Sequence, residues 1–210
     1  MKILKNFAVF EGLDGAGTTT QLNILKSFFL QNQLSLPPFY TTFEPTDGCI
    51  GKLIRSGLRE NAVFDPKTLA LLFAADRNEH IFGPEGIKKR CEAGELVVCD
   101  RYVPSSLVYQ GITCGDEFPA ILNKDFPGPE LLIFFDIDPE TAQKRMTGRG
   151  KKEIYENLNF QLQVRRHYKN ILPKFAEQGV RVEILDGSLA PEEVSKKVLD
   201  LIKKMPIFEL

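Results

Sequence analysis

The fold is decided by the stretch Phe7-Ala8-Val9-Phe10-Glu11-Gly12-Leu13-Asp14-Gly15-Ala16-Gly17-Thr18-Thr19-Thr20. A short apolar run leads into a glycine-rich turn, and an amphipathic segment follows with Leu22, Leu25, Phe28 and Phe29 on one face. Strand, glycine loop and helix in this order predict a phosphate-binding P-loop. Backbone N–H groups of such a loop and the helix N-terminus attract a polyphosphate.

The loop departs from the usual P-loop pattern at one position. Gly12, Gly17 and Thr19 fit G-x-x-x-x-G-K-[ST], but Thr18 stands where the lysine belongs. The lysine normally brings a positive charge to the β- and γ-phosphates, whereas a threonine hydroxyl can hydrogen-bond but carries no charge. This stretch alone therefore leaves open a tight turn that binds nothing.

Length and composition indicate a single α/β domain over residues 1–210. The 27 Lys and Arg residues nearly balance the 28 Asp and Glu residues, which argues against a nucleic-acid partner. Four cysteines without C-x-x-C spacing and only two histidines argue against a structural zinc site. Cys99 lies in an apolar strand pattern, which favours buried free thiols over disulfides. Neither a signal peptide nor a membrane span fits, so we expect a cytoplasmic protein.

Short apolar runs alternate with longer helical patterns along the chain. The runs expected to form strands are residues 7–10, 38–43, 96–99, 131–137 and 180–185. Residues 96–99 and 131–135 are apolar at every position, which is typical of strands buried on both faces of a parallel sheet. We therefore expect a three-layer P-loop sandwich in which helices flank a five-stranded parallel sheet.

Helix boundaries are marked by caps, glycines and prolines. The expected helices run from Asp65-Pro66 to Gly83-Pro84, from Pro84 to just before Gly94, from about Tyr155 to Pro173, and onward from Pro191. Residues 111–129, rich in Gly, Pro and Asp, are expected to form a surface loop or a loosely helical excursion.

Ligands of an open parallel sheet bind beyond the carboxyl ends of its strands. This rule predicts functional residues directly after the apolar runs, in residues 14–19, 43–45, 100–102 and 136–138. Arg101 suits bidentate capture of a phosphate, and Asp100 could orient Arg101 or reach a hydrated Mg²⁺. A structural ion pair between the two is the alternative.

Phe73 and Arg77 lie one helical turn apart on the same face. An aromatic ring beside a guanidinium suits a nucleobase, which Phe73 could stack on while Arg77 donates to ring carbonyls. A core phenylalanine is the alternative. Glu44, after the second strand, could hold a metal ion or a sugar hydroxyl, or belong to a turn without a ligand.

The densest basic cluster of the chain comprises Arg145, Arg149, Lys151 and Lys152, flanked by glycines. A solvated loop is the usual meaning of such a run. In a phosphoryl-transfer enzyme, a mobile basic loop can instead close over the triphosphate and supply charge to the transition state. Such a loop could offset the charge that Thr18 lacks.

Taken together, these motifs resemble the thymidylate kinase family. Family members carry stretches similar to Phe-Glu-Gly-Leu-Asp-Gly-Ala-Gly at 10–17, Leu-Leu-Phe-Ala-Ala-Asp-Arg at 71–77 and Asp-Arg-Tyr at 100–102 with a downstream serine and aromatic. Tyr155-Glu156-Asn157 and Phe160-Gln161 resemble the end of the family's lid, which implies a lid at about residues 145–157. The matches run in order from residue 7 to about residue 170.

The resemblance implies a homodimeric enzyme that transfers a phosphoryl group from ATP to dTMP with Mg²⁺, giving dTDP for dTTP synthesis. Residues implied to hold the ATP phosphates are Gly12, Leu13, Asp14, Gly15, Ala16, Gly17, Thr18 and Thr19. Those implied to bind dTMP are Asp14, Phe43, Phe73, Arg77, Arg101, Ser105, Ser106, Tyr109, Tyr155 and Gln161. Catalysis would involve Asp14, Arg101 and Arg149, and the metal would be near Thr19, Asp100 and Glu156.

Three positions depart from the family pattern. Thr18 replaces the lysine, and Phe43 stands where bacterial relatives commonly have an arginine. Gly15 excludes a catalytic arginine in the P-loop, so the resemblance points to Arg149 in the lid. Two other functions stay open: a deoxynucleoside kinase, and a non-catalytic nucleotide-binding homologue disabled by Thr18.

Overall fold

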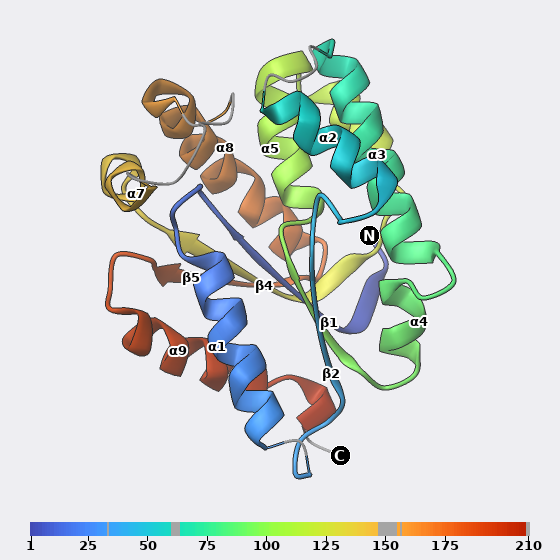
Figure 1. Cartoon of the computed structure of the whole chain (residues 1–210), viewed down its shortest axis with the longest axis vertical. Helices are drawn as coiled ribbons and strands as arrows, with labels where there is room; N and C mark the ends of the chain where they lie inside the picture. The colour runs from blue at the N-terminus through green and yellow to red at the C-terminus, as the bar shows by residue number, and fades with distance from the viewer. Residues whose placement is uncertain (33, 60–63, 147–154, 156, 209–210) are drawn as a thin grey trace.

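A single parallel sheet forms the centre of the molecule in the computed structural model, which describes residues 1–32, 34–59, 64–146, 155 and 157–208. Its five strands lie in the order β2-β3-β1-β4-β5, all parallel (Figure 1). The strands are β1 (Ile3–Gly12), β2 (Phe39–Phe43), β3 (Leu96–Asp100), β4 (Gly128–Asp136) and β5 (Arg181–Asp186). The predicted five-stranded parallel sheet is therefore confirmed.

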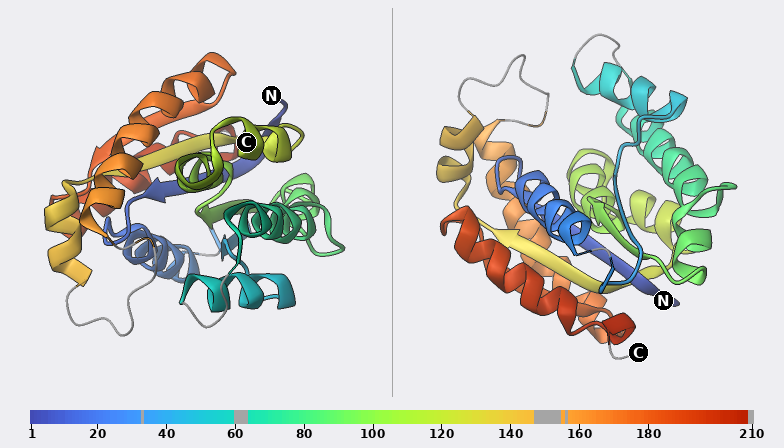
Figure 2. Two further views of the ribbon diagram at one scale, coloured as in Figure 1. Left: turned by 90° about the horizontal axis from the view of Figure 1, so that it is seen from above. Right: turned by 60° about the horizontal axis from the view of Figure 1, so that its bottom comes forward.

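Helices cover both faces of this sheet (Figure 2). They are α1 (Thr18–Gln31), α2 (Cys49–Leu58), α3 (Pro66–Phe82), α4 (Ile87–Glu92), α5 (Val103–Cys114), α6 (Glu117–Asn123), α7 (Pro139–Met146), α8 (Leu158–Glu177) and α9 (Pro191–Lys203), followed by a short 3₁₀ turn at Pro206–Phe208. Helices α1 and α9 contact each other on one face, and α4, α5 and α8 lie on the other. Residues 96–99 and 131–135 are completely buried between these layers, which explains why they are apolar at every position.

The glycine loop joins β1 to α1 at the carboxyl edge of the sheet. Gly15 and Gly17 have φ values of +85° and +96°, a region that side chains disfavour. A Cβ on Gly15 would also lie 2.4 Å from the carbonyl oxygen of Ala142 in α7. Backbone conformation and close packing therefore both require glycine at position 15.

Several predicted helix boundaries were wrong. Helix α8 continues through Pro173 to Glu177, because the buried Leu172 and Phe175 on either side pack into the core and outweigh the hydrogen bond that proline removes. It begins at Leu158 because the side chain of Asn157 caps it, accepting from the amides of Asn159 and Phe160.

Other elements also differ from the sequence-based expectation. Helix α4 begins at Ile87 rather than Pro84, and α2, α5 and α7 were not predicted. For residues 111–129, the helical alternative fits better than the surface loop, because α5 extends to Cys114 and α6 follows it. All four cysteines are free, but Cys49 is exposed, so the expectation of buried thiols is wrong there. Among the described residues, none of the helices combines the length and apolar composition needed to traverse a lipid bilayer.

Candidate active site

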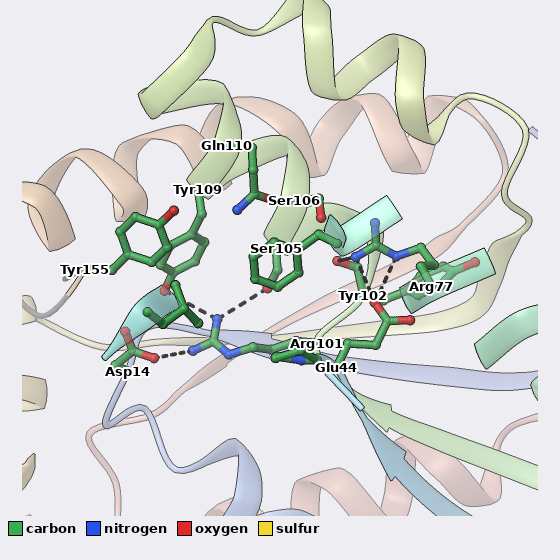
Figure 3. Close-up of a pocket in the computed structure, with 13 residues that line it drawn as sticks. Asp14, Glu44, Arg77, Arg101, Tyr102, Ser105, Ser106, Tyr109, Gln110 and Tyr155 are labelled. Atoms are coloured by element: carbon green, nitrogen blue, oxygen red, sulfur yellow. Dashed lines mark hydrogen bonds and ion pairs between the residues drawn. The ribbon is translucent and has the colours of Figure 1, made fainter. Parts of the chain in front are cut away.

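A cavity opens beyond the carboxyl ends of β1, β2 and β3 (Figure 3). Its lining comes from the P-loop, the segments that follow β2 and β3, helices α2, α3 and α5, and the segment before α8: Asp14, Glu44, Pro45, Leu58, Phe73, Arg77, Arg101, Tyr102, Ser105, Ser106, Tyr109, Gln110 and Tyr155. Three of the four clusters predicted from the ends of the strands therefore contribute residues to this cavity.

Arg101 lies at the floor of this cavity, where β3 ends. Its backbone has a φ of +69°, an uncommon conformation for a residue with a side chain. The guanidinium donates to Asp14 Oδ1 over 2.6 Å and to the hydroxyls of Ser105 and Tyr109 over 3.3 Å each. Figure 3 shows the guanidinium between Asp14 and Ser105, so it is held in place before any ligand arrives.

The surroundings of Arg101 keep it charged. Burial lowers the pKa of the guanidinium, but the nearby Tyr109, Asp14 and Tyr168 raise it by more, so the net pKa is raised well above its ordinary value. Asp14 is held on its other side by Gln161, whose amide donates to Asp14 Oδ2 over 3.1 Å. The site therefore offers a fixed cation next to a fixed carboxylate.

Arg77 projects from α3 into the wall of the same cavity and is almost completely buried. Its guanidinium pairs with Glu44 over 2.8 Å and donates to the side chain of Asn123 and to the carbonyl of Tyr102 over 3.1 Å. Phe73, one turn earlier on α3, also lines the cavity. The predicted pairing of the two on one wall is confirmed, and their contact with a base stays a prediction.

Glu44 supports Arg77 from behind. With His80 and Cys99 it brings three potential metal ligands within 4.8 Å of one another. Their polar atoms already have partners, because the two ring nitrogens of His80 lie 3.0 Å from Glu44 Oε1 and 2.6 Å from Thr42 Oγ1, and the Cys99 thiol donates to the carbonyl of Arg101 over 3.0 Å. We therefore interpret the cluster as a hydrogen-bonded brace for Arg77.

A second cavity surrounds the glycine loop. It is lined by the loop, the start of α1, the end of β3 and the end of α7: Leu13, Asp14, Gly15, Gly17, Thr18, Thr19, Thr20, Asp100, Arg101 and Met146. Asp14 and Arg101 thus line both cavities and form a shared wall between them. Of the described residues in this second lining, Arg101 alone carries a positive charge.

One carboxylate oxygen of a residue that lines the second cavity has no hydrogen-bond partner among the described residues. Thr19 donates its hydroxyl to Asp100 Oδ2 over 2.8 Å, while Asp100 Oδ1 is buried and has no hydrogen-bond partner among the described residues. A hydroxyl and a buried carboxylate oxygen at the end of a strand fit the oxygen ligands or ligand-bound waters of Mg²⁺. The donor set is therefore compatible with the predicted metal.

Some predicted residues lie elsewhere. Phe43 does not line the cavity and packs beneath the Arg55 guanidinium, 5.5 Å from its ring centre. The strand-end rule was wrong for Asp136 and Asp138: Asp136 pairs with Arg165 over 2.6 Å, and Asp138 caps α7.

The remaining lid assignments cannot be compared with the structure. Arg149, Glu156 and most of the predicted lid at 145–157 lie outside the described residues. Tyr155 is described, and its ring stacks on Phe160 with 5.0 Å between centroids while lying 5.4 Å from that of Tyr109. Tyr109 and Tyr155 line the first cavity, and Phe160 supports the Tyr155 ring by stacking on it.

Three polar residues of the site were not singled out from the sequence. Gln110 is buried and points into the first cavity (Figure 3). Asn123, in α6, accepts a hydrogen bond from the Arg77 guanidinium. Glu11 is completely buried next to the glycine loop. An acidic residue inside an otherwise apolar strand was the available signal for Glu11, whereas Asn123 lay in a segment read as a loop or loosely helical.

Comparison with known proteins agrees with this geometry. Residues 10–198 match the family model described as thymidylate kinase. A curated sequence from Treponema pallidum named as a thymidylate kinase is 42% identical over 207 residues, covering 97% of this chain and 98% of its own length. A second curated sequence named as a thymidylate kinase, from Pyrobaculum aerophilum, is 39% identical over 204 residues. The match covers 97% of this chain and 99% of the relative's own length. The solved thymidylate kinase from Candida albicans superimposes with a TM-score of 0.80 at 24% sequence identity. The superposition covers 97% of this chain and 93% of the Candida albicans chain.

Proposed function

Since this chain belongs to the thymidylate kinase family and phosphorylates dTMP with ATP, we propose that the transfer takes place across the wall shared by Asp14 and Arg101. The observation that carries this proposal is that the two residues line both cavities. An acceptor phosphate in the first cavity and a γ-phosphate in the second would then meet at the same guanidinium. Catalysis consists of positioning and charge neutralisation around an in-line transfer, without a covalent intermediate.

The first cavity is the acceptor site in this proposal. Arg101 grips the dTMP phosphate, and Phe73 stacks on the thymine while Arg77 donates to its carbonyl oxygen. Ser106 and Gln110 face the same space, and the Ser106 hydroxyl is buried without a partner among the described residues. An unpaired buried hydroxyl beside a cavity is available to bond a polar edge of the base. Tyr109 and Tyr155 enclose the sugar and phosphate end.

The second cavity is the donor site. Backbone N–H groups of residues 12–19 surround the ATP phosphates at the N-terminus of α1. Thr19 and Asp100 are the described residues that would hold Mg²⁺, directly or through water, and the ion would supply charge neutralisation to the phosphates. Because Thr18 supplies no charge, we assign transition-state charge to Arg149, which lies outside the described residues.

Replacement of Asp100 by asparagine should raise the Mg²⁺ concentration needed for half-maximal rate by about tenfold, because the buried oxygen near Thr19 loses its charge. The measurement is a Mg²⁺ titration of the initial rate at saturating nucleotides. Asp138→Asn is the matched control, since Asp138 also follows a strand but lines neither cavity. An unchanged titration midpoint in Asp100→Asn would count against this metal assignment.

The proposed function is tested by ADP release from the purified protein with dTMP, dUMP, thymidine or the other monophosphates as acceptor. Turnover with dTMP and not with thymidine is expected. The family match does not favour the two alternatives. Phosphorylation of thymidine but not dTMP would indicate a deoxynucleoside kinase, and nucleotide binding without turnover would indicate a non-catalytic homologue.

We also propose that the chain forms a homodimer through α3. Leu71, Ala75, Asn78 and Phe82 are all exposed and lie at i, i+4, i+7 and i+11, which places them on one stripe of the helix. Leu71 is 50% exposed and Phe82 48% exposed. A continuous stripe with large apolar side chains at both ends suits a helix-packed interface between copies.

Leu71→Glu should convert the dimer to a monomer, because the interface would have to bury unpaired charges. Sedimentation velocity at micromolar concentrations measures the change. Leu34→Glu is the control, since Leu34 is fully exposed and lies outside the stripe. A dimer that survives Leu71→Glu unchanged would show that this face is not the interface.

We place the protein in the cytoplasm. All four cysteines are free, as is usual in a reducing compartment.

A further inference from the structure

We propose that Glu11 is a positioning residue for Arg101. Its buried carboxylate holds the segment from Arg101 to Ser105 in the conformation that presents the guanidinium to the acceptor phosphate. The inference rests on the proposed function, in which Arg101 binds the phosphate of dTMP.

Glu11 occupies a place where a carboxylate is costly. It is the second-to-last residue of β1 and is 0% exposed. A charge in such a place needs several hydrogen bonds to offset lost hydration. Glu11 accepts four, from the amide of Tyr102 over 2.9 Å, the amide of Ser105 over 3.2 Å, and the hydroxyls of Ser105 and Tyr168 over 2.7 Å each. An apolar residue would fill this strand position without such a set of partners, so the carboxylate has a specific task here.

The first task is to cap α5. This helix begins directly after Tyr102, whose own side chain makes no capping hydrogen bond. Glu11 reaches across from β1 and accepts from the amides of Tyr102 and Ser105. These are orphan donors of a helix N-terminus, and a carboxylate is the side chain that the helix dipole favours there. The start of α5 is therefore fixed to the strand that leads into the glycine loop.

The second task is to hold the uncommon backbone of Arg101. The amide of Arg101 donates to the carbonyl of Phe10 over 2.8 Å, and the next amide, that of Tyr102, donates to the Glu11 carboxylate. The amides on both sides of the residue with φ +69° are thus bonded to consecutive residues of β1. A left-handed conformation at a non-glycine residue persists only where its surroundings enforce it. Loss of the Glu11 charge would weaken one of these two restraints.

The third task is to orient the guanidinium itself. Arg101 Nη1 donates to Ser105 Oγ over 3.3 Å, and Ser105 Oγ donates to Glu11 Oε2 over 2.7 Å. Burial raises the pKa of Glu11, while the charge of Arg101 and the hydrogen bonds from Ser105, Tyr168 and Tyr102 lower it by less. The same carboxylate therefore fixes the backbone of Arg101 and the hydroxyl that its side chain contacts.

A residue that only stabilised the fold would affect every ligand of the first cavity equally, whereas a residue acting through Arg101 affects the phosphate. The test compares dissociation constants for dTMP and thymidine, measured by calorimetry on the full chain without ATP. Glu11→Gln should weaken dTMP binding about tenfold and thymidine binding less than about twofold, because a charge-assisted hydrogen-bond network is lost. Tyr168→Phe, which keeps the buried ring and removes one donor, should shift the ratio in the same direction by less.

Glu130→Gln is the matched control, since Glu130 accepts from the amide of Asn6 and lines neither cavity. It should leave the ratio of the two constants unchanged. Arg101→Ala, measured in parallel, should abolish the preference for dTMP over thymidine. If it does and both Glu11→Gln and Tyr168→Phe keep the wild-type ratio, the inference is overturned and the proposed function stands. If Arg101→Ala keeps the preference, the proposed phosphate contact fails and the inference with it. If Glu11→Gln does not fold, Tyr168→Phe decides.

Discussion

Arg101→Ala should lower kcat/KM for dTMP by about 10³-fold, equivalent to about 4 kcal/mol of lost transition-state stabilisation. The size of the effect follows from geometry. Arg101 is the one cation in the described part of the chain that lines both cavities, and Asp14, Ser105 and Tyr109 hold it in place. Its loss would remove the charge at the point where donor and acceptor phosphates meet, and would leave the Asp14 carboxylate facing the phosphates without its paired cation. Steady-state ADP release measures the change.

Two further variants complete the experiment: one separates the charge of Arg101 from the shape of its guanidinium, and the other is a control. Arg101→Lys keeps a charge but loses the planar fork, so we expect an intermediate loss. Arg181→Ala removes a half-exposed arginine paired with Glu183 in β5, remote from both cavities, and should leave kcat/KM nearly unchanged. A loss in Arg101→Ala no greater than in Arg181→Ala would contradict the central place of this residue.

The sheet could be predicted because its strands obey a strong rule. Residues 96–99 and 131–135 are buried on both faces of the sheet, so every position in them must be apolar, and a run of apolar residues can be recognised without knowing how the side chains pack. Helix ends were harder. Pro173 normally predicts a stop, but burial of neighbouring side chains from distant elements decided the outcome, and no local pattern contains that information.

In the site, too, the features set by local sequence could be predicted, whereas those set by distant contacts could not. Phe73 and Arg77 share a helix face, so their spacing along the sequence was enough to predict that both side chains lie on the same wall of the first cavity. Glu11, Gln110 and Asn123 owe their roles to contacts across the fold: Asn123 reaches Arg77 over 46 positions, and Glu11 reaches Tyr168 over 157. Asp136 satisfied the strand-end rule but is neutralised by Arg165 on α8, a partner that the local sequence does not reveal.

The missing P-loop lysine can be interpreted only with the cavity in view. Thr18 is buried beside Gly12, where its methyl group would lie 3.3 Å from a Cβ on that glycine. The threonine therefore packs into the loop while its position still borders the donor cavity. A loop without lysine can position phosphates through its amides, but the charge that develops during transfer must be balanced by another group.

Arg149→Ala should reduce kcat by about 10³-fold, as expected for loss of a transition-state arginine. The residue lies outside the described part of the chain, so this prediction rests on the resemblance and on the lack of a lysine at position 18. Thr18→Lys alone should change ATP affinity or rate and leave dTMP binding unaltered, because Thr18 lines only the donor cavity. Lys151→Ala and Lys152→Ala, in the same basic segment, should each cost less than Arg149→Ala.

The double variant Thr18→Lys/Arg149→Ala tests the compensation directly. If Arg149 supplies charge that the loop lacks, a lysine at position 18 takes over part of its role, and Arg149→Ala should cost at least about tenfold less in the lysine background than in the natural one. Single-turnover rates at saturating ATP and dTMP isolate this coupling from changes in binding. Near-wild-type turnover in Arg149→Ala would remove the lid arginine from the mechanism. Equal losses in the two backgrounds would show that Arg149 and position 18 act on different charges, since groups that serve the same charge cannot contribute independently.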